Sequence, residues 1–239
     1  MSSPATAPAT IAATTDLQRT YGEGQAAVHA LRGVSISFPA GQFTAIMGPS
    51  GSGKSTLMHV LAGLDSPTAG SVVVDGVELA GLDDGALTQL RRDRVGFVFQ
   101  AFNLLPVLDA RENIVLPMSI AGRDPDSEWV DQLIDLVGLR DRITHRPSEL
   151  SGGQQQRVAV VRALASRPAV VFADEPTGNL DSHASTEILQ LLRRSVDEFG
   201  QTIIMVTHDE EAAAYADRLL VLRDGAIVED RAPSAAASA

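Results

Sequence analysis

Short runs of apolar residues recur along the chain and predict buried β-strands. Residues 43–47 (FTAIM), 169–173 (AVVFA), 202–206 (TIIMV) and 219–222 (LLVL) are of this kind, and strands buried on both faces typically have such sequences. Residues 34–38 alternate between apolar and polar instead, and residues 71–79 contain two short strands around the turn residues Asp75 and Gly76. Strands therefore dominate the N-terminal part of the chain and return in its second half.

Helical spacing replaces this pattern between residues 101 and 161. Trp129, Leu133, Leu136 and Val137 share one helical face, and Gly138 follows as a stop signal. After the strand at 169–173, a second helical stripe contains Ile188, Leu191, Leu192, Ser195, Val196 and Phe199. Helices that separate strands predict an α/β core, residues 16–100 and 162–232, interrupted by a helical subdomain at 101–161. We expect residues 1–15 and 233–239, which are rich in small residues, to be disordered tails.

The strand at 43–47 leads into a glycine-rich turn, GPSGSGKST, that precedes a helical segment. Its spacing matches the phosphate-loop pattern G-x-x-x-x-G-K-[ST]. In such a loop the backbone N–H groups and the helix N-terminus bind the β-phosphate, the lysine reaches the β- and γ-phosphates, and the serine hydroxyl ligates Mg²⁺. Lys54 is the only lysine of the chain, since the other 18 of the 19 Lys and Arg residues are Arg. The residues predicted to bind ATP here are Gly48, Ser50, Gly51, Ser52, Gly53, Lys54, Ser55 and Thr56.

Composition and charge exclude several classes of function. The chain has 239 residues and no cysteine, so it can form one large domain without disulfides or thiolate chemistry. Its net charge of −11 argues against a nucleic-acid partner. No apolar run reaches the roughly 18 residues of a membrane span, so we expect no direct membrane insertion. The N-terminus lacks the basic and apolar regions of a signal peptide.

Two carboxylates directly follow the strand at 169–173. Asp174 and Glu175 would lie at the carboxyl edge of the sheet, where open α/β folds bind ligands. We expect Asp174 to hold Mg²⁺ and Glu175 to orient or deprotonate a water in line with the γ-phosphate. A helix-capping acidic pair is the alternative interpretation.

A second glycine-rich turn, LSGGQ at residues 150–154, also precedes a helix. Ser151, Gly152, Gly153 and Gln154 would offer a hydroxyl and unhindered amides to an anion at the helix N-terminus. Because one nucleotide does not need two such turns, these residues predict that two copies pair head-to-tail around two nucleotides. An ordinary N-cap is the simpler interpretation.

The ordered set of motifs resembles that of the nucleotide-binding domain of ABC transporters, from about residue 20 to residue 228. The phosphate loop is followed by Gln100 at a strand end, then LSGGQ, VVFADEP, GNLD and a strand that ends before His208. FVFQAFNLLP (97–106), ARENIVLPM (110–118), GGQQQRVA (152–159) and ADEPTGNLDS (173–182) resemble the macrolide-efflux and lipoprotein-release branch. The resemblance implies an α/β fold with a P-loop NTPase (RecA-like) core, an N-terminal antiparallel β-subdomain and an inserted α-helical subdomain, so that residues 16–232 form a single nucleotide-binding domain.

The resemblance also implies roles for individual residues. Tyr21 would stack on adenine, Gln100 would contact Mg²⁺ or the attacking water, Asp181 would reach the opposite phosphate loop, and His208 would bond the γ-phosphate and position Glu175. A loop aromatic, a polar strand end and an N-cap are the structural alternatives for the first three. The predicted catalytic residues are Lys54, Gln100, Glu175 and His208, and the predicted metal ligands are Ser55, Gln100 and Asp174.

The implied cofactors are ATP and Mg²⁺, and the implied partners are a second copy of the chain and a separate transmembrane permease. The apolar residues Phe102, Leu104, Leu105 and Pro106 would receive the permease, unless they pack inside the helical lobe. A GTP-binding switch or a protein kinase would need a further lysine, which the chain lacks. We therefore expect an ATPase at the cytoplasmic face of a bacterial membrane that drives export or the extrusion of lipoproteins, peptides or antibiotics. An ATPase that regulates an extracytoplasmic partner mechanically, without transport, remains the alternative.

Overall fold

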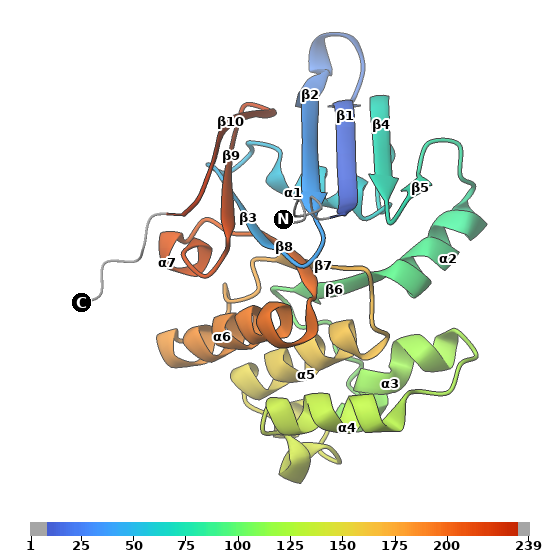
Figure 1. Cartoon of the computed structure of the whole chain (residues 1–239), viewed down its shortest axis with the longest axis vertical. Coiled ribbons are helices and arrows are strands. Elements are labelled where there is room, and N and C mark those ends of the chain that lie inside the picture. The colour runs from blue at the N-terminus through green and yellow to red at the C-terminus, as the bar shows by residue number, and fades with distance from the viewer. Residues whose placement is uncertain (1–8, 234–239) are drawn as a thin grey trace, which may run out of the picture.

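Two β-sheets organise the computed structural model, which describes residues 9–233 (Figure 1). The larger sheet has the strand order β10-β9-β3-β8-β7-β6 and is parallel except for its edge strand β10. The smaller sheet has the order β2-β1-β4-β5 and is antiparallel. The strands of the larger sheet are β3 (Phe43–Met47), β6 (Val95–Phe99), β7 (Val170–Asp174), β8 (Thr202–Val206), β9 (Arg218–Arg223) and β10 (Ala226–Arg231). Those of the smaller sheet are β1 (Thr10–Tyr21), β2 (Val28–Pro39), β4 (Ala69–Val74) and β5 (Val77–Glu78).

The central strands are buried on both faces, as their continuous apolar sequences predict. Phe172 of β7 and Ile204 of β8 face one core cluster, whereas their neighbours Val171 and Ile203 face the other. Successive side chains of a strand point to opposite faces, so a strand between two core layers is apolar at most consecutive positions. The carboxyl ends of β3, β7 and β8 consequently meet at one edge of a well-packed sheet.

Helix α1 (Lys54–Leu61) contacts both β1, β2 and β4 of the smaller sheet and β8 of the larger one. The opposite face of the larger sheet is covered by helices, as Figure 1 shows. The helices in contact with the sheet are α5 (Gly152–Ala165) and α6 (Ser182–Phe199), and α3 (Ala110–Ile120) and α4 (Ser127–Leu136) pack against α5. The remaining helices are α2 (Asp84–Arg94), α7 (Glu210–Ala213) and single 3-10 turns at Gly24–Ala26, Arg140–Arg142 and Pro147–Glu149. The edge of the larger sheet at which β3, β7 and β8 end therefore lies between the smaller sheet with α1 and a layer of helices.

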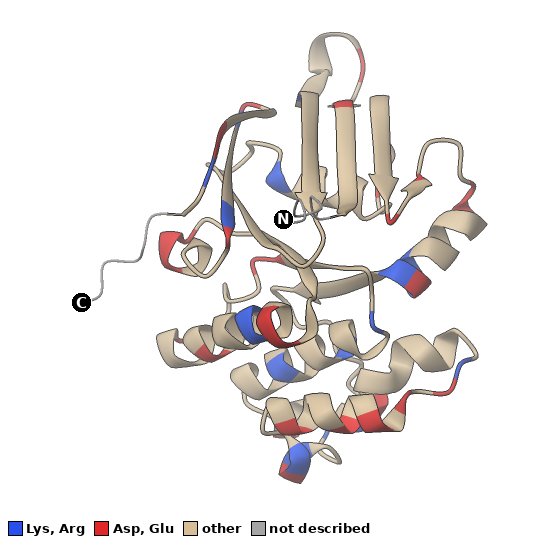
Figure 2. Cartoon of the chain, viewed as in Figure 1, with Lys and Arg blue, Asp and Glu red and all other residues tan. Residues whose placement is uncertain are grey.

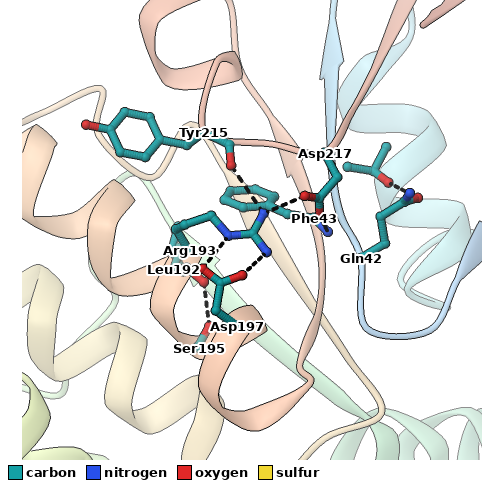
Figure 3. Close-up of polar contacts among 9 residues, drawn as sticks. Gln42, Phe43, Leu192, Arg193, Ser195, Asp197, Tyr215 and Asp217 are labelled. Carbon is teal, nitrogen blue, oxygen red and sulfur yellow. Dashed lines mark hydrogen bonds and ion pairs between the residues drawn. The ribbon is translucent and has the colours of Figure 1, made fainter. Parts of the chain in front are cut away.

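Arg193 ties α6 to the larger sheet (Figure 3). Its guanidinium donates to both carboxylate oxygens of Asp197, at 2.6 and 3.1 Å, and to Asp217 at 2.9 Å. Asp217 in turn accepts the backbone N–H of Phe43 at 2.8 Å, where β3 begins. Burial alone would lower the pKa of Arg193, but these hydrogen bonds and charges raise it above its ordinary value. The strand that leads into the phosphate loop is thus held at its start by a charged network.

Several sequence predictions are confirmed by the elements observed, and others need correction. The strands at 43–47 and 202–206, the hairpin at 71–79 and the two helical stripes are present, although Phe199 at the end of its stripe stays 39% exposed. The expected disordered tail at 1–15 is wrong for residues 10–15, which lie in β1, while residues 1–8 fall outside the described residues. The tail at 233–239 also lies outside them, apart from Pro233.

The helical subdomain boundary predicted between residues 161 and 162 falls inside α5, which continues to Ala165. Figure 2 marks acidic residues in red along α4, whose sequence contains Glu128, Asp131 and Asp135 but no basic residue. Among residues 9–233, we find no helix that combines the length and the apolar character needed to cross a membrane.

Candidate functional site

A cleft of about 650 Å³ opens beside the phosphate loop. Its walls come from the loop and the start of α1, from β2, from the turn between β9 and β10, and from the residues that follow β7 and β8. The lining residues include Val28, His29, Ser50, Gly51, Ser52, Gly53, Lys54, Ser55, Thr56, Glu175, His208, Asp224 and Gly225. The fold thus brings the predicted phosphate loop and the predicted pair Glu175 and His208 into one cavity.

Two glycines of the loop are required by its close packing. Gly48 and Gly53 adopt φ values of 151° and 101°, which are unfavourable for residues with a side chain. A Cβ at Gly48 would overlap the carbonyl oxygen of Leu222, and one at Gly53 would overlap that of Ala30. The loop can therefore keep its backbone N–H groups toward the cleft only with glycine at these positions.

The start of α1 has the properties of an anion site. No side chain of the described residues caps its N-terminus, so its first N–H groups are free for a ligand. The ammonium of Lys54 donates to the carbonyl oxygens of Gly48 at 2.8 Å and Pro49 at 3.0 Å, which curls the loop around it. The hydroxyl of Ser52 is buried and forms no hydrogen bond within the described structure. These donors fit the phosphates of a nucleotide.

Glu175 and His208 form a hydrogen-bonded pair at the cleft. The imidazole Nδ1 of His208 lies 2.8 Å from the carboxylate Oε1 of Glu175. This hydrogen bond, together with the charge of the carboxylate, raises the pKa of His208 above 6.5. Glu175 has the left-handed φ of 47°, and its backbone N–H donates to Val206 at 2.9 Å, so the turn after β7 directs its side chain toward His208.

Asp174 ends β7 beside this pair and is partly buried. Burial is the main reason why the pKa of Asp174 is raised, and electrostatic interactions with His59 and Lys54 oppose this shift. Among residues 9–233, no cluster of three or more His, Cys, Asp and Glu side chains could hold a metal alone. Mg²⁺ typically takes one or two protein ligands and completes its shell with phosphates and waters. The hydroxyl of Ser55 and the carboxylate of Asp174 fit such a site.

Gln100 follows β6 but does not line the cleft. Its side chain donates to Oδ1 of Asn179 at 3.2 Å, and the amide of Asn179 donates to the carbonyl of Gln100 at 3.0 Å. The side-chain amide of the buried Gln156 in α5 donates to the carbonyls of Phe99, the last residue of β6, and of Pro176, which follows β7. These contacts of Asn179 and Gln156 could not be predicted from local spacing, because their partners Gln100 and Phe99 are 79 and 57 residues away along the chain.

The other predicted residues also lie outside the cleft lining. Ser151 and Gln154 form a capping box at the start of α5, with hydrogen bonds of 3.3 and 2.9 Å, and Asp181 caps α6 through Ala184 at 2.8 Å. The capping alternatives for these residues are therefore correct as descriptions of the single chain. Tyr21 ends β1, where its hydroxyl donates to Asp65. Tyr21 is therefore the last residue of a strand and not a loop aromatic, as the structural alternative had it.

Comparisons with known proteins agree with this geometry. The family model described as ABC transporter matches residues 31–178. The macrolide export ATP-binding/permease protein MacB of Bdellovibrio bacteriovorus is 48% identical over 214 residues, which cover 90% of this chain but only 33% of that protein. An uncharacterized ABC transporter ATP-binding protein of Thermotoga maritima is 49% identical, with 89% of this chain and 91% of that protein covered. The chain thus spans about a third of the length of the MacB relatives that it matches.

A solved structure has a similar fold. The ATP-binding cassette MJ0796, in a dimeric post-hydrolysis state bound to ADP and Pi, matches with a TM-score of 0.83 and 40% identity, over 93% of this chain and 99% of that one. The family match covers more than half of the chain and includes both the phosphate loop and Glu175. The chain therefore belongs to the ABC transporter family, as one of its ATP-binding cassettes.

Proposed function

We propose that this chain binds Mg-ATP in the cleft and hydrolyses it as the energy-supplying subunit of an exporter. Residues 16–232 would act as one nucleotide-binding domain. The observation that carries the proposal is the placement of the hydrogen-bonded pair Glu175 and His208 in the same cavity as the phosphate loop. A general base next to a bound triphosphate is the arrangement that hydrolysis requires. The relative from Bdellovibrio bacteriovorus is named as a macrolide export protein, which supports export of such compounds.

The loop from Gly48 to Thr56 would bind the β- and γ-phosphates, with Lys54 as the point charge. Mg²⁺ would be held by Ser55 and Asp174. Gln100 would join them once its side chain turned away from Asn179. When bound, Mg²⁺ neutralises charge on the phosphates. Glu175 would orient and deprotonate a water that attacks the γ-phosphorus, while the bond from that phosphorus to the oxygen it shares with the β-phosphate breaks. His208 would donate to the γ-phosphate from its second ring nitrogen and keep Glu175 in position.

A second copy of the chain would complete each site. The Ser151 hydroxyl accepts the N–H of Gln154, so its own proton remains free to donate to a γ-phosphate. With Gly152 and Gly153, this group would close over the opposite phosphate loop, and the free carboxylate oxygen of Asp181 would reach across the same interface. Head-to-tail pairing satisfies both sites by one two-fold axis, and the MJ0796 cassette is a dimer in its solved structures.

A transmembrane permease would convert this closure into movement of the exported compound, and the chain would then lie at the cytoplasmic face of a bacterial membrane. The segment after Gln100 supports such docking. Leu105 is 44% exposed and Val107 is 71% exposed. Phe102 and Leu104 are less exposed, and Leu104 packs against the core. Exposed apolar side chains that share a segment commonly mark partner sites.

The test is the mass of Glu175→Gln in solution, measured by light scattering with and without Mg-ATP, together with turnover of the wild-type chain. We expect the variant to bind ATP without hydrolysing it and to shift from one chain of 25.2 kDa to a dimer only when Mg-ATP is present. Lys54→Ala serves as the matched control and should remain a monomer. The proposal would be contradicted if the wild-type chain did not hydrolyse ATP, or if the mass of Glu175→Gln in solution were the same with and without Mg-ATP.

A further inference from the structure

Tyr21 belongs to a three-residue cluster with Arg19 and Asp65. The hydroxyl of Tyr21 donates to Oδ2 of Asp65 at 2.6 Å. Arg19 pairs with both carboxylate oxygens of Asp65, through Nε at 3.0 Å and Nη2 at 2.7 Å. The same guanidinium lies over the ring of Tyr21, 4.5 Å from its centroid. Each member of the cluster therefore touches the other two.

The cluster connects the end of β1 to the end of α1. Asp65 lies just beyond this helix, where its backbone N–H donates to the carbonyl of His59 at 3.2 Å. The opposite end of α1 forms the phosphate loop. Because a helix is a rigid rod, the hydroxyl of Tyr21 is held at a set distance from the residues that would bind phosphate.

The carboxylate of Asp65 is well suited to act as the anchor. Burial would raise the pKa of Asp65, but hydrogen bonds from Tyr21 and from the backbone of Ser66, together with the charge of Arg19, outweigh burial and lower it. The group is therefore ionised at neutral pH and accepts both partners. Hydrogen bonds to an ionised acceptor are stronger and more directional than those between neutral groups.

One face of the tyrosine ring is covered by the guanidinium of Arg19, and Tyr21 as a residue remains 40% exposed. A guanidinium over one ring face is attracted by the ring electrons and restricts rotation of the ring. A flat base can then stack only on the face that Arg19 leaves free. A ring that is already oriented loses less freedom when its ligand binds than a ring that rotates.

We propose that Asp65 and Arg19 are positioning residues that hold the Tyr21 ring in the orientation needed to stack on the purine base of a nucleoside triphosphate. This inference rests on the proposed nucleotide-binding function. It predicts that the tyrosine hydroxyl contributes to base recognition, although it lies at the far end of the ring and would not itself touch the base.

The experiment compares Tyr21→Phe with Tyr21→Leu, both combined with Glu175→Gln so that ATP is not consumed. Calorimetric titration would give the Kd of Mg-ATP and of Mg-tripolyphosphate, which has the phosphates without the base. Tyr21→Phe keeps the stacking ring and removes only the hydroxyl. We expect it to weaken ATP binding about 3- to 10-fold, as one lost hydrogen bond does, and to leave tripolyphosphate binding unchanged. Tyr215→Phe, at the only other tyrosine of the chain, is the matched control and should change neither.

Asp65→Ala should weaken ATP binding to a similar extent, and its combination with Tyr21→Phe should add nothing further, because both changes break the same hydrogen bond. If Tyr21→Phe binds ATP like its parent while Tyr21→Leu does not, the ring suffices and the inference is wrong, although the proposed function stands. An equal loss of tripolyphosphate binding would also overturn it, since the effect would then not concern the base. If the parent protein bound neither ligand, both the inference and the proposed function would fail.

Discussion

Glu175, the proposed general base, adopts a backbone conformation that is unfavourable for its residue type. Its φ of 47° lies in the left-handed region, which glycine adopts without cost. A comparison of Glu175→Gly with Glu175→Ala isolates this cost. Both variants lose the carboxylate and its hydrogen bond to His208, so only the response of the backbone differs between them.

The expected difference follows from two opposing effects. A residue with a Cβ pays about 1–2 kcal/mol in the left-handed conformation. Glycine avoids this cost but makes the unfolded chain more flexible, which offsets about 0.4–1 kcal/mol. From the middle of each range, the glycine variant should therefore be more stable than the alanine variant by about 0.8 kcal/mol. For a chain of 239 residues this corresponds to a rise in Tm of about 1–4 °C.

The assay is thermal and urea unfolding of both variants without nucleotide, with ATP turnover measured in parallel. Turnover should fall about 10²- to 10⁴-fold in both, the usual effect of losing a general base. Glu187, inside the regular helix α6, provides the control pair, because there the glycine variant should be about 1 kcal/mol less stable than the alanine variant. Equal stability of Glu175→Gly and Glu175→Ala would refute the conclusion that the site stores backbone strain.

Three further predictions concern the site and its support. Lys54→Arg should abolish measurable ATP binding in a calorimetric titration, because the ammonium lies between carbonyl oxygens of its own loop and a guanidinium is wider; wild-type affinity would contradict this. His208 should titrate above 6.5 by NMR, and Glu175→Gln should lower that midpoint, since the carboxylate raises the pKa. Because folding raises the pKa of His208, the pair with Glu175 stabilises the folded state fully below pH 6.5, and this stabilisation is lost as the pH rises through the folded-state pKa. Arg193→Ala should lower the free energy of unfolding by about 1–2 kcal/mol, less than for a fully buried network because its carboxylate partners are partly exposed, whereas an unchanged urea midpoint would show that the network does not stabilise the fold.

The elements that sequence predicted well are those with an uninterrupted pattern. The strands β3 and β8 were predicted with their observed ends, because a strand that is buried on both faces has a nearly continuous run of apolar residues. β1 was not predicted, and its residues 10–15 were assigned to a disordered tail, because its alternation is interrupted. The pairing register shifts between Thr14 and Leu17, and Asp16 in between has a φ of 46°. A bulge of this kind moves apolar residues out of the two-residue period, so the segment no longer has the sequence of a strand.

The sequence alone determined the chemistry of the phosphate loop, of Asp174 and Glu175, and of the turn at Ser151, since each of these depends on neighbours within a few residues. The tertiary structure decided which of them meet: Glu175 and His208 join the phosphate loop in one cleft, whereas Ser151 lies outside it. It also decided how Gln100 pairs with Asn179 and how Tyr21 is held by Asp65. Such pairs are separated by tens of residues, and their side chains come together only when strands and helices pack. The spacing of residues within one motif cannot predict how close two such side chains lie, because the packing of the whole core sets the distance between them.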